Sequence, residues 1–346
     1  MRGLLSTGVT ASISWAMRIS TRAATMLSTS QPIPNVSARA LEIITAGRRS
    51  FTLTIHIISL EGMRIHNGTV PDTVLIDAAT THDGVAPLSE QFLRGLSEPE
   101  LGHTHVYILA DDQVVALAAG DGASWELVVH PAYRRRGLGT ALLGSLGESA
   151  HVWAHGNLPA AKGLAAARGW ASIRELLVMG VDWVPAETQL PDSMVCLNLD
   201  ESAERFGRDA VLDAWLAANN EAFDWHPEQG GWDRARLDQA MAASWFNSAD
   251  VLLLWDGDQL AGFHWTKRHS AELGEVYVVG LAAAYRGRGL GDPLVRLGLD
   301  HLAEAGMGRI ILYVEADNVP AVAAYEKLGF EEVENHVLYA HESAEN

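Results

Sequence analysis

The sequence predicts an α/β (α+β) fold made of two tandem domains, each a twisted mixed sheet flanked by helices. The first observation is a repeat: Tyr-Arg-x-Arg-Gly-Leu-Gly occurs at Tyr133–Gly139 and again at Tyr285–Gly291, 152 positions later. The second is that strand-like and helix-like runs alternate around both copies, as they do in mixed α/β sheets. Two copies of one domain follow, and each is long enough to fold alone.

In the first copy, which starts near Val74, short apolar runs bounded by turn residues predict strands, and longer amphipathic runs predict helices. Asp111 and Asp112 are typical of a tight turn between two strands. In order, the predicted elements are a helix at Ala86–Leu96, strands at Val106–Ala110, Val114–Ala119 and Trp125–Val129, a helix after the repeated phrase to about Ala150, a strand at His151–Ala154, a helix at Pro159–Arg168 and a strand at Leu176–Val181.

The second copy follows the same order, with Asp256-Gly257-Asp258 as the turn between its first two strands. Asp292 and Pro293 are typical of a helix N-cap and a first-turn proline. In order, the predicted elements are helices at Arg208–Ala218 and Trp232–Ala243, strands at Val251–Trp255, Leu260–Thr266 and Glu275–Val279, a helix at Pro293–Ala305, a strand at Ile310–Val314, a helix at Pro320–Leu328 and a strand at His336–Tyr339.

Composition divides the chain into a leader at 1–62, domains at 63–184 and 197–346, and a proline-containing linker at 185–196. The leader holds six arginines against two acids and is rich in Ser and Thr. Three interpretations stay open for it: a transit peptide, a disordered segment, or a stretch upstream of a true start at Met63. Its apolar run Phe51–Leu60 is too short to span a bilayer.

The formal net charge of −18 argues against a nucleic-acid partner, because affinity for phosphate backbones depends on clustered Lys and Arg. The 48% hydrophobic and 20% charged composition is that of a soluble globular protein, and no membrane partner is indicated. The single cysteine, Cys196, excludes intrachain disulfides and a cysteine-built zinc site. We expect a monomer in the cytoplasm.

The repeated Arg-Gly loop predicts an anion site. Arg-x-x-Gly-x-Gly between a strand and a helix offers backbone N–H groups uncovered by side chains, at the positive end of the helix dipole. A Walker loop needs Gly-Lys-Ser/Thr, and a dinucleotide fingerprint needs a third glycine; neither copy has these. For one copy, a glycine-rich helix entry with solvated arginines would be an equal alternative, but two copies in one context favour a pyrophosphate of another kind.

This loop, followed by Asn318-Val-Pro-Ala321 and Tyr325-Glu-Lys-Leu-Gly-Phe330, resembles the GCN5-related N-acetyltransferase superfamily. The resemblance implies acetyl-CoA as cosubstrate, with its pyrophosphate on the loop amides and its pantetheine arm along the preceding strand. In the first copy it implies contacts with Leu127, Val128, Val129, Arg135, Arg136, Gly137, Leu138, Gly139 and Thr140. In the second copy it implies contacts with Val279, Gly280, Leu281, Arg286, Gly287, Arg288, Gly289, Leu290, Gly291, Asp292, Asn318, Val319, Pro320, Ala321, Val322 and Ala323.

The tandem copies, with Trp225-His-Pro-Glu-Gln-Gly-Gly-Trp232, Gly262-Phe-His-Trp-Thr-Lys267 and Gly274-Glu-Val-Tyr-Val-Val-Gly280, resemble the mycothiol synthase family from Met63 onward. That family acetylates the cysteinyl amine of cysteinyl-glucosaminyl-inositol, a small-molecule substrate. The resemblance implies that the pocket for this acceptor is lined by Glu90, Glu228, Lys267, Glu275 and Tyr313.

Acetyl transfer needs a base for the ammonium and benefits from a donor for the thiolate. We expect Glu275 to be the base and Tyr325 the acid, since the resemblance points to both. Aligning the loops places Ala123 opposite Glu275, and aligning the later glycines places Ala165 or Leu164 opposite Tyr325. The first domain is therefore expected to bind acetyl-CoA without catalysing its transfer.

Two other functions stay open: an acetyltransferase for another amine, such as a protein N-terminus, an aminoglycoside or a polyamine, and an acyl-CoA sensor without turnover. Histidines 103, 105, 151 and 155 occur as pairs, but a metal site usually needs three or more convergent ligands. We expect no metal, because the mechanism needs no Lewis acid.

Overall fold

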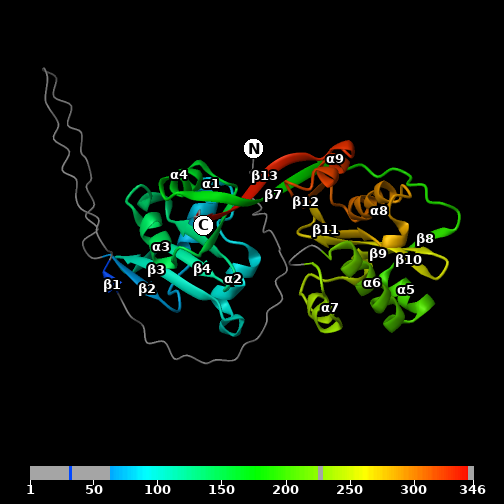
Figure 1. The fold of residues 1–346 in the computed structure, drawn as a ribbon, viewed down its shortest axis with the longest axis horizontal. Coiled ribbons are helices and arrows are strands. Elements are labelled where there is room, and N and C mark those ends of the chain that lie inside the picture. Colours follow the sequence, from blue (N-terminus) through cyan, green and yellow to red (C-terminus); the bar gives the residue numbers. More distant parts are fainter. Residues whose placement is uncertain (1–30, 33–62, 225–228, 342–346) are drawn as a thin grey trace, which may run out of the picture. The chain divides into compact units, whose positions relative to one another are not determined.

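The computed structural model describes residues 31–32, 63–224 and 229–341, which form two compact units (Figure 1). The N-terminal unit holds the described residues up to Ile173 together with Val337–His341, and the C-terminal unit holds Arg174–His336. The units thus divide the chain inside two long strands, and not at the proline-containing segment 185–196. Apart from residues 31–32, the leader lies outside the described residues.

The sheet of the N-terminal unit is antiparallel except for one parallel pair. Its strands follow the order β1 (Gln31–Pro32), β2 (Arg64–Asn67), β3 (Thr104–Ala110), β4 (Gln113–Gly120), β5 (Trp125–Val129), β6 (His151–His155) and the C-terminal part of β13 (Glu331–His341). Strands β5 and β6 run parallel and pair only at Trp125 with Val152 and at Glu126 with Trp153. They separate beyond that point.

Helices cover both faces of this sheet. They are α1 (Val74–Asp83), α2 (Glu90–Ser97), α3 (Leu138–Leu146) and α4 (Pro159–Ala167). Leu75 of α1 and Phe92 of α2 pack with Leu117 in one core, and Leu142 of α3 packs with Ile108 in another. Each fully buried side chain of this size stabilises the fold by roughly 1.5–3 kcal/mol.

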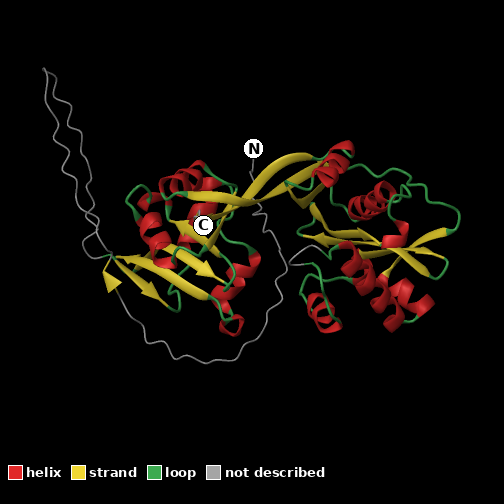
Figure 2. Ribbon diagram, viewed as in Figure 1, coloured by secondary structure: helices red, strands yellow, loops and turns green. Residues whose placement is uncertain are grey.

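The C-terminal unit repeats this plan (Figure 2). Its strands follow the order β7 (Trp170–Asp182), β12 (Arg309–Glu315), β11 (Leu273–Leu281), β10 (Gln259–Arg268), β9 (Val251–Asp256) and β8 (Met194–Asn198), with β11 and β12 as the parallel pair. Its helices are α5 (Leu199–Phe206), α6 (Arg208–Ala222), α7 (Arg234–Met241), α8 (Gly291–Glu304) and α9 (Val319–Lys327). Helices α5 to α7 cover a tryptophan-rich core, and α8 and α9 cover a second core on the opposite face.

The structure confirms the predicted fold class and most of the predicted elements. Five helices and strands were missed: β1, β2, β8, α1 and α5. Strands β7 and β13 are longer than expected, and α3 ends at Leu146, before Gly147. The prediction for Asp292 was wrong, because α8 begins at Gly291 with Leu290 as its N-cap; Asp292 lies in the first turn and pairs with Arg296. No helix of the described segments is long and apolar enough to cross a membrane.

The segment that follows β7 is held by one buried carboxylate. Asp300 of α8, only 8% exposed, accepts hydrogen bonds from Trp183 Nε1 (2.8 Å), Thr188 Oγ1 (3.0 Å) and the Ala186 N–H (3.3 Å). Part of the expected linker is therefore fixed against α8.

We predict that Asp300→Ala lowers the free energy of unfolding by about 2–3 kcal/mol, because it leaves buried donors without their charged acceptor. Urea unfolding at pH 7 measures the change. Asp209→Ala is the matched control, since its ion pair with Arg234 is exposed and should contribute little to stability. Equal losses in the two variants would contradict a special role for Asp300.

Candidate active site

The two Arg-Gly loops have the same backbone geometry. Each follows a short 3₁₀ turn, Pro131–Tyr133 or Ala283–Tyr285, and each has a left-handed glycine where the chain enters the helix. Gly137 has φ of 83° and Gly289 has φ of 78°, and a Cβ at either would point into open space. Both loops therefore present bare backbone at the N-terminus of a helix, as an anion site requires.

The arginines of the loops have distinct tasks. The first arginine of each loop ties the loop to the end of the preceding strand: Arg134 Nε donates to the Val129 carbonyl (3.0 Å), and Arg286 Nε to the Leu281 carbonyl (3.3 Å). The last arginine of each loop lies over the tyrosine of the same loop, with the Arg136 guanidinium carbon 4.9 Å from the centre of the Tyr133 ring. Arg288 lies 4.8 Å from the Tyr285 ring in the same way. The repeated sequence thus encodes repeated contacts.

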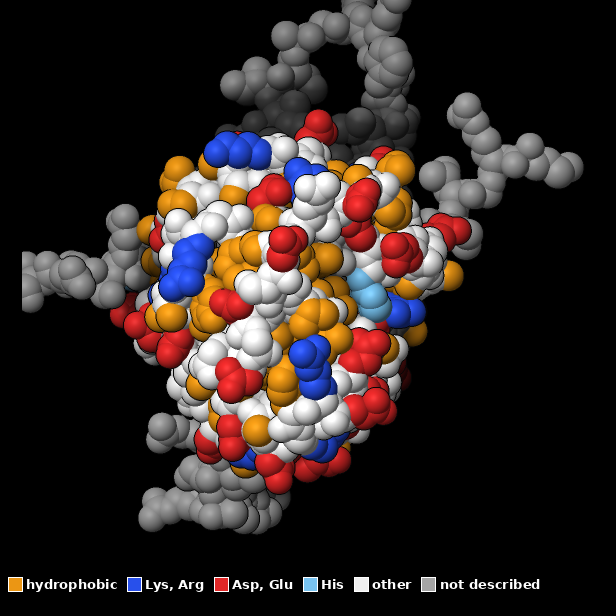
Figure 3. All heavy atoms as spheres, turned by 90° about the vertical axis from the view of Figure 1, so that its right-hand side faces the viewer, with side chains coloured by type: hydrophobic (Ala, Val, Ile, Leu, Met, Phe, Trp, Pro, Cys, Tyr) orange, Lys and Arg blue, Asp and Glu red, His pale blue; other side chains and the backbone are white. Residues whose placement is uncertain are grey.

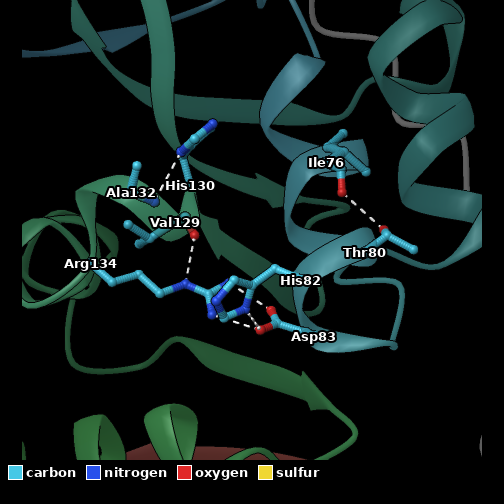
Figure 4. Close-up of polar contacts among 8 residues, drawn as sticks. All are labelled: Ile76, Thr80, His82, Asp83, Val129, His130, Ala132 and Arg134. Carbon is cyan, nitrogen blue, oxygen red and sulfur yellow. Dashed lines mark hydrogen bonds and ion pairs between the residues drawn. The ribbon is translucent and has the colours of Figure 1, made fainter.

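A bidentate ion pair fixes the N-terminal loop against α1 (Figure 4). Arg134 Nη1 and Nη2 lie 2.7 and 2.6 Å from the two carboxylate oxygens of Asp83. The hydrogen bonds from Arg134 lower the pKa of Asp83, and burial opposes them. In the C-terminal unit Arg286 Nη2 donates to the Glu221 carbonyl, so the guanidinium expected to contact acetyl-CoA is engaged with the protein.

The N-terminal unit has a cavity of about 490 Å³ where β5 and β6 separate. Its walls are the end of β5, the Arg-Gly loop, β6 and α4. Of the residues predicted to contact acetyl-CoA in this unit, the cavity is lined by Leu127, Val128, Val129, Arg135, Gly137, Leu138, Gly139 and Thr140. Arg136, which stacks on Tyr133, is absent from this lining.

Sequence reasoning missed a buried carboxylate beside this cavity. Glu126 of β5, 2% exposed, accepts a hydrogen bond from the Ser89 N–H (2.7 Å) and lies 2.9 Å from His155 Nε2. His155 lines the cavity, as does Tyr339, whose hydroxyl donates to Asn157 Oδ1 (2.8 Å). An acidic residue inside the apolar strand Trp125–Val129 was the available signal.

In the C-terminal unit, strands β10, β11 and β12 bring together three of the predicted residues. Lys267 and Glu275 lie directly opposite each other and are 3% and 2% exposed. Tyr313 follows on β12; burial raises the pKa of its hydroxyl well above the usual range, with Glu275 and Glu334 as further causes. Lys267 Nζ lies 4.5 Å from the centre of the Trp245 ring. The result is a buried cluster with an acid, a cation and a phenol.

Histidines that sequence analysis did not single out complete this cluster. His269 Nε2 lies 2.6 Å from Glu275 Oε2. His336 stacks on Tyr313 with 5.9 Å between ring centres, and its Nδ1 lies 3.5 Å from Glu334 Oε1. The described residues contain no group of three or more potential ligands that could hold a metal ion.

The remaining predicted residues lie at element ends. Val279, Gly280 and Leu281 end β11, and Asn318, whose Oδ1 accepts from the Ala321 N–H (3.4 Å), caps α9. Residues Gly287–Asp292 form the loop and the start of α8. Glu90 begins α2 in the N-terminal unit, and Glu228 lies outside the described residues.

Tyr325 lies on α9 and packs against Phe330 with 5.7 Å between ring centres. Its ring stays partly exposed, whereas burial of the hydroxyl raises its pKa to about 12. The motif Asn-x-Pro-Ala opens both α4 and α9, at Asn157 and at Asn318. Counting from these asparagines, Leu164 stands where Tyr325 stands in the second unit.

Comparison with known proteins identifies both units. Models of the acetyltransferase (GNAT) family match residues 214–330 and 102–170. A mycothiol acetyltransferase of Corynebacterium efficiens is 55% identical over 268 residues, which cover 77% of this chain and 90% of that protein. One of Mycolicibacterium smegmatis is 44% identical over 283 residues, which cover 77% and 92%.

Solved structures show the same fold. A GCN5-related N-acetyltransferase from Sphaerobacter thermophilus has a TM-score of 0.58 at 21% identity, covering 77% of this chain and 90% of that one. A GNAT-family acetyltransferase from Colwellia psychrerythraea has a TM-score of 0.56 at 14% identity, covering 80% and 99%.

The ion pair between Asp83 and Arg134 predicts a pH-dependent contribution to stability. Asp83 has a lowered pKa in the folded state, so its contribution is complete above the unfolded value near 3.8 and is lost as the pH falls through the folded value. We expect Asp83→Asn to lower the free energy of unfolding by about 1–3 kcal/mol at pH 7, and by progressively less below about pH 4.

Urea unfolding from pH 7 to pH 3 measures this difference. Glu98→Gln is the control in the same unit, because its pair with Arg94 is exposed and should contribute little to stability. A difference between Asp83→Asn and the native protein that stays constant down to pH 3 would show that the pair does not titrate as described.

Proposed function

The chain belongs to the mycothiol acetyltransferase family, and from that premise we propose that it transfers the acetyl group of acetyl-CoA to the cysteinyl amine of cysteinyl-glucosaminyl-inositol. The products are mycothiol and CoA. The observation that carries the proposal is the buried cluster of the C-terminal unit, where Glu275 lies opposite Lys267 and near Tyr313. This arrangement offers a base and polar contacts at one place on the sheet.

Glu275 removes the proton that the acceptor ammonium must lose, directly or through one water molecule. The free amine then forms a bond from its nitrogen to the thioester carbon, and the bond from that carbon to sulfur breaks. The sulfur leaves as a thiolate and takes up a proton to become CoA. The net change is release of one proton for each acetyl group transferred to an ammonium.

Tyr325 assists the leaving thiolate. With a pKa of about 12 its hydroxyl is protonated at neutral pH and can donate a hydrogen bond to sulfur. Thiols ordinarily titrate near 8.5, so complete proton transfer from this phenol would be uphill by about 3 pKa units. Tyr325 therefore acts first as a hydrogen-bond donor to the negative charge that develops on sulfur. Once its proton passes to sulfur, the phenolate must be reprotonated promptly.

The acceptor is a small cationic molecule rich in hydroxyl groups. Glu275 suits its ammonium, and Tyr313 and Lys267 can hydrogen-bond to its hydroxyls. Acidic side chains are spread over the face in Figure 3, with fewer basic ones, which favours the approach of a cation. Glu90 and Glu228 remain predicted contacts of the acceptor.

The N-terminal unit binds a second acetyl-CoA without turning it over. Its cavity, its left-handed Gly137 and the start of α3 supply a site for the pantetheine arm and pyrophosphate. We assign the binding function to residues 63–184 and the catalytic function to residues 197–346. We place the enzyme in the cytoplasm as a monomer that needs no metal.

The first test is release of CoA thiol from acetyl-CoA with cysteinyl-glucosaminyl-inositol as acceptor. We expect turnover by the native enzyme and a loss of roughly 10²–10⁴-fold in kcat for Glu275→Gln, since general base catalysis contributes that much. Glu201→Gln is the control, because its carboxylate caps α5 and lies outside the cluster.

The same assay with other amines distinguishes the alternative functions. Release with a protein N-terminus, an aminoglycoside or a polyamine, and none with cysteinyl-glucosaminyl-inositol, would keep the acetyltransferase and discard the acceptor. Binding of acetyl-CoA without release for any amine would indicate a sensor.

The repeated glycines allow the two cofactor sites to be tested separately. Gly137→Val and Gly289→Val introduce the same side chain at the same left-handed position of each loop. We expect calorimetry to show two acetyl-CoA sites in the native protein and one in each variant. Turnover should be lost in Gly289→Val only; loss in Gly137→Val, with the fold intact by circular dichroism, would contradict a non-catalytic N-terminal unit.

A further inference from the structure

We propose that His269 is a positioning residue for the acetyl transfer: it holds the Glu275 carboxylate in the orientation that accepts the proton of the acceptor. The inference rests on the proposed function of Glu275. His269 Nε2 lies 2.6 Å from Glu275 Oε2, and the two side chains are 10% and 3% exposed. A contact this short between buried groups fixes the imidazole and the carboxylate in one arrangement.

The turn between β10 and β11 holds the imidazole in place. The His269 and Ser270 N–H groups donate to the Leu273 carbonyl at 3.0 and 3.3 Å. Ser270 Oγ in turn accepts from the Glu272 and Leu273 N–H groups at 3.2 and 3.1 Å. This turn closes the hairpin on which Lys267 and Glu275 lie opposite each other, so the backbone of His269 is fixed within reach of the Glu275 carboxylate.

Several polar side chains surround the pair of His269 and Glu275, so the orientation of the carboxylate decides which of them it contacts. Lys267 faces Glu275 from β10, and Tyr313 faces it from β12. Beyond Tyr313, β13 contributes Glu334 and His336, which lie 3.5 Å apart. The Glu275 carboxylate could turn toward several of these polar side chains, and the hydrogen bond to His269 selects one rotamer. His269 engages Oε2, which leaves Oε1 to accept the proton from the acceptor.

Two other buried pairs show what is particular to His269. Glu126 with His155 and Asp250 with His301 have comparable distances, 2.9 and 2.7 Å. Asp250 also binds Arg268 at 2.5 Å, an arrangement that stabilises the fold without nearby acid-base chemistry. His269 alone among these three binds the carboxylate proposed as the base of the reaction.

The test compares His269→Ala and His269→Gln with the native enzyme in the CoA-release assay from pH 5 to 9. We expect kcat to fall by roughly 10- to 100-fold in His269→Ala, the size typical of lost outer-shell partners. The KM for acetyl-CoA should change less than about twofold, since His269 lies outside the loop that binds it. The loss in kcat should appear across the whole pH range, because it reflects the orientation of the carboxylate.

His269→Gln keeps a hydrogen-bond donor at similar reach. We expect its kcat within about fivefold of the native value, because the Glu275 carboxylate keeps its orientation. His301→Gln is the matched control: it alters another buried pair of the same unit and should leave kcat within about twofold of the native value. Thermal unfolding and acetyl-CoA binding report on the fold of each variant.

Native kcat in His269→Ala would overturn the proposal. So would an equal loss of kcat in His301→Gln, which would indicate a general effect on the unit. If His269→Ala does not fold, His269→Gln decides, and a loss in kcat of about tenfold or more in that variant, with the fold intact, overturns the proposal. Full activity of Glu275→Gln would instead overturn the proposed base, so the two failures are distinguishable.

Discussion

Each unit depends on one parallel pair of strands in an otherwise antiparallel sheet. Parallel neighbours need a crossover connection, and here the crossover contains the Arg-Gly loop and its helix, α3 or α8. The loop therefore lies beyond the C-terminal end of the first strand, where ligands bind in open α/β sheets. Because β5 and β6 pair over two positions only, their separation opens the cavity beside that loop.

Burying a charged group raises the free energy of the folded state, and in this protein hydrogen bonds and ion pairs offset that cost. Asp300 accepts three hydrogen bonds, and Asp250 binds Arg268 and His301. Glu275 has His269 at 2.6 Å and Lys267 across the hairpin. The first two sets of contacts stabilise the fold. In the third, the pairing also fixes the orientation of the carboxylate that we propose as the base of the reaction.

The loops and the order of the elements around them could be predicted from the sequence, because they follow from local patterns repeated in one chain. Lys267, Glu275 and Tyr313 were expected only from the family resemblance, and they lie on three neighbouring strands. The partners His269, His155 and Glu126 could not be predicted in this way. Their contacts depend on strand register, and the pairing of β10 with β11 has a bulge, with Tyr277 as the extra residue of β11, that the pairing of β4 with β5 lacks. Aligning the repeats by their glycines set Glu275 against Ala123 and did not draw attention to Glu126.

Two side chains separate the copies at the position of the proposed chemistry. Counting from the shared Asn-x-Pro-Ala motif, Val152 and Leu164 stand where the second unit has Tyr313 and Tyr325, and both line the N-terminal cavity. Aliphatic side chains offer no hydroxyl to an acceptor or to a leaving sulfur, whereas the left-handed glycine of the loop is kept at Gly137. Under the proposed function, the N-terminal unit keeps the groups suited to binding a cofactor and lacks the donors that assist transfer.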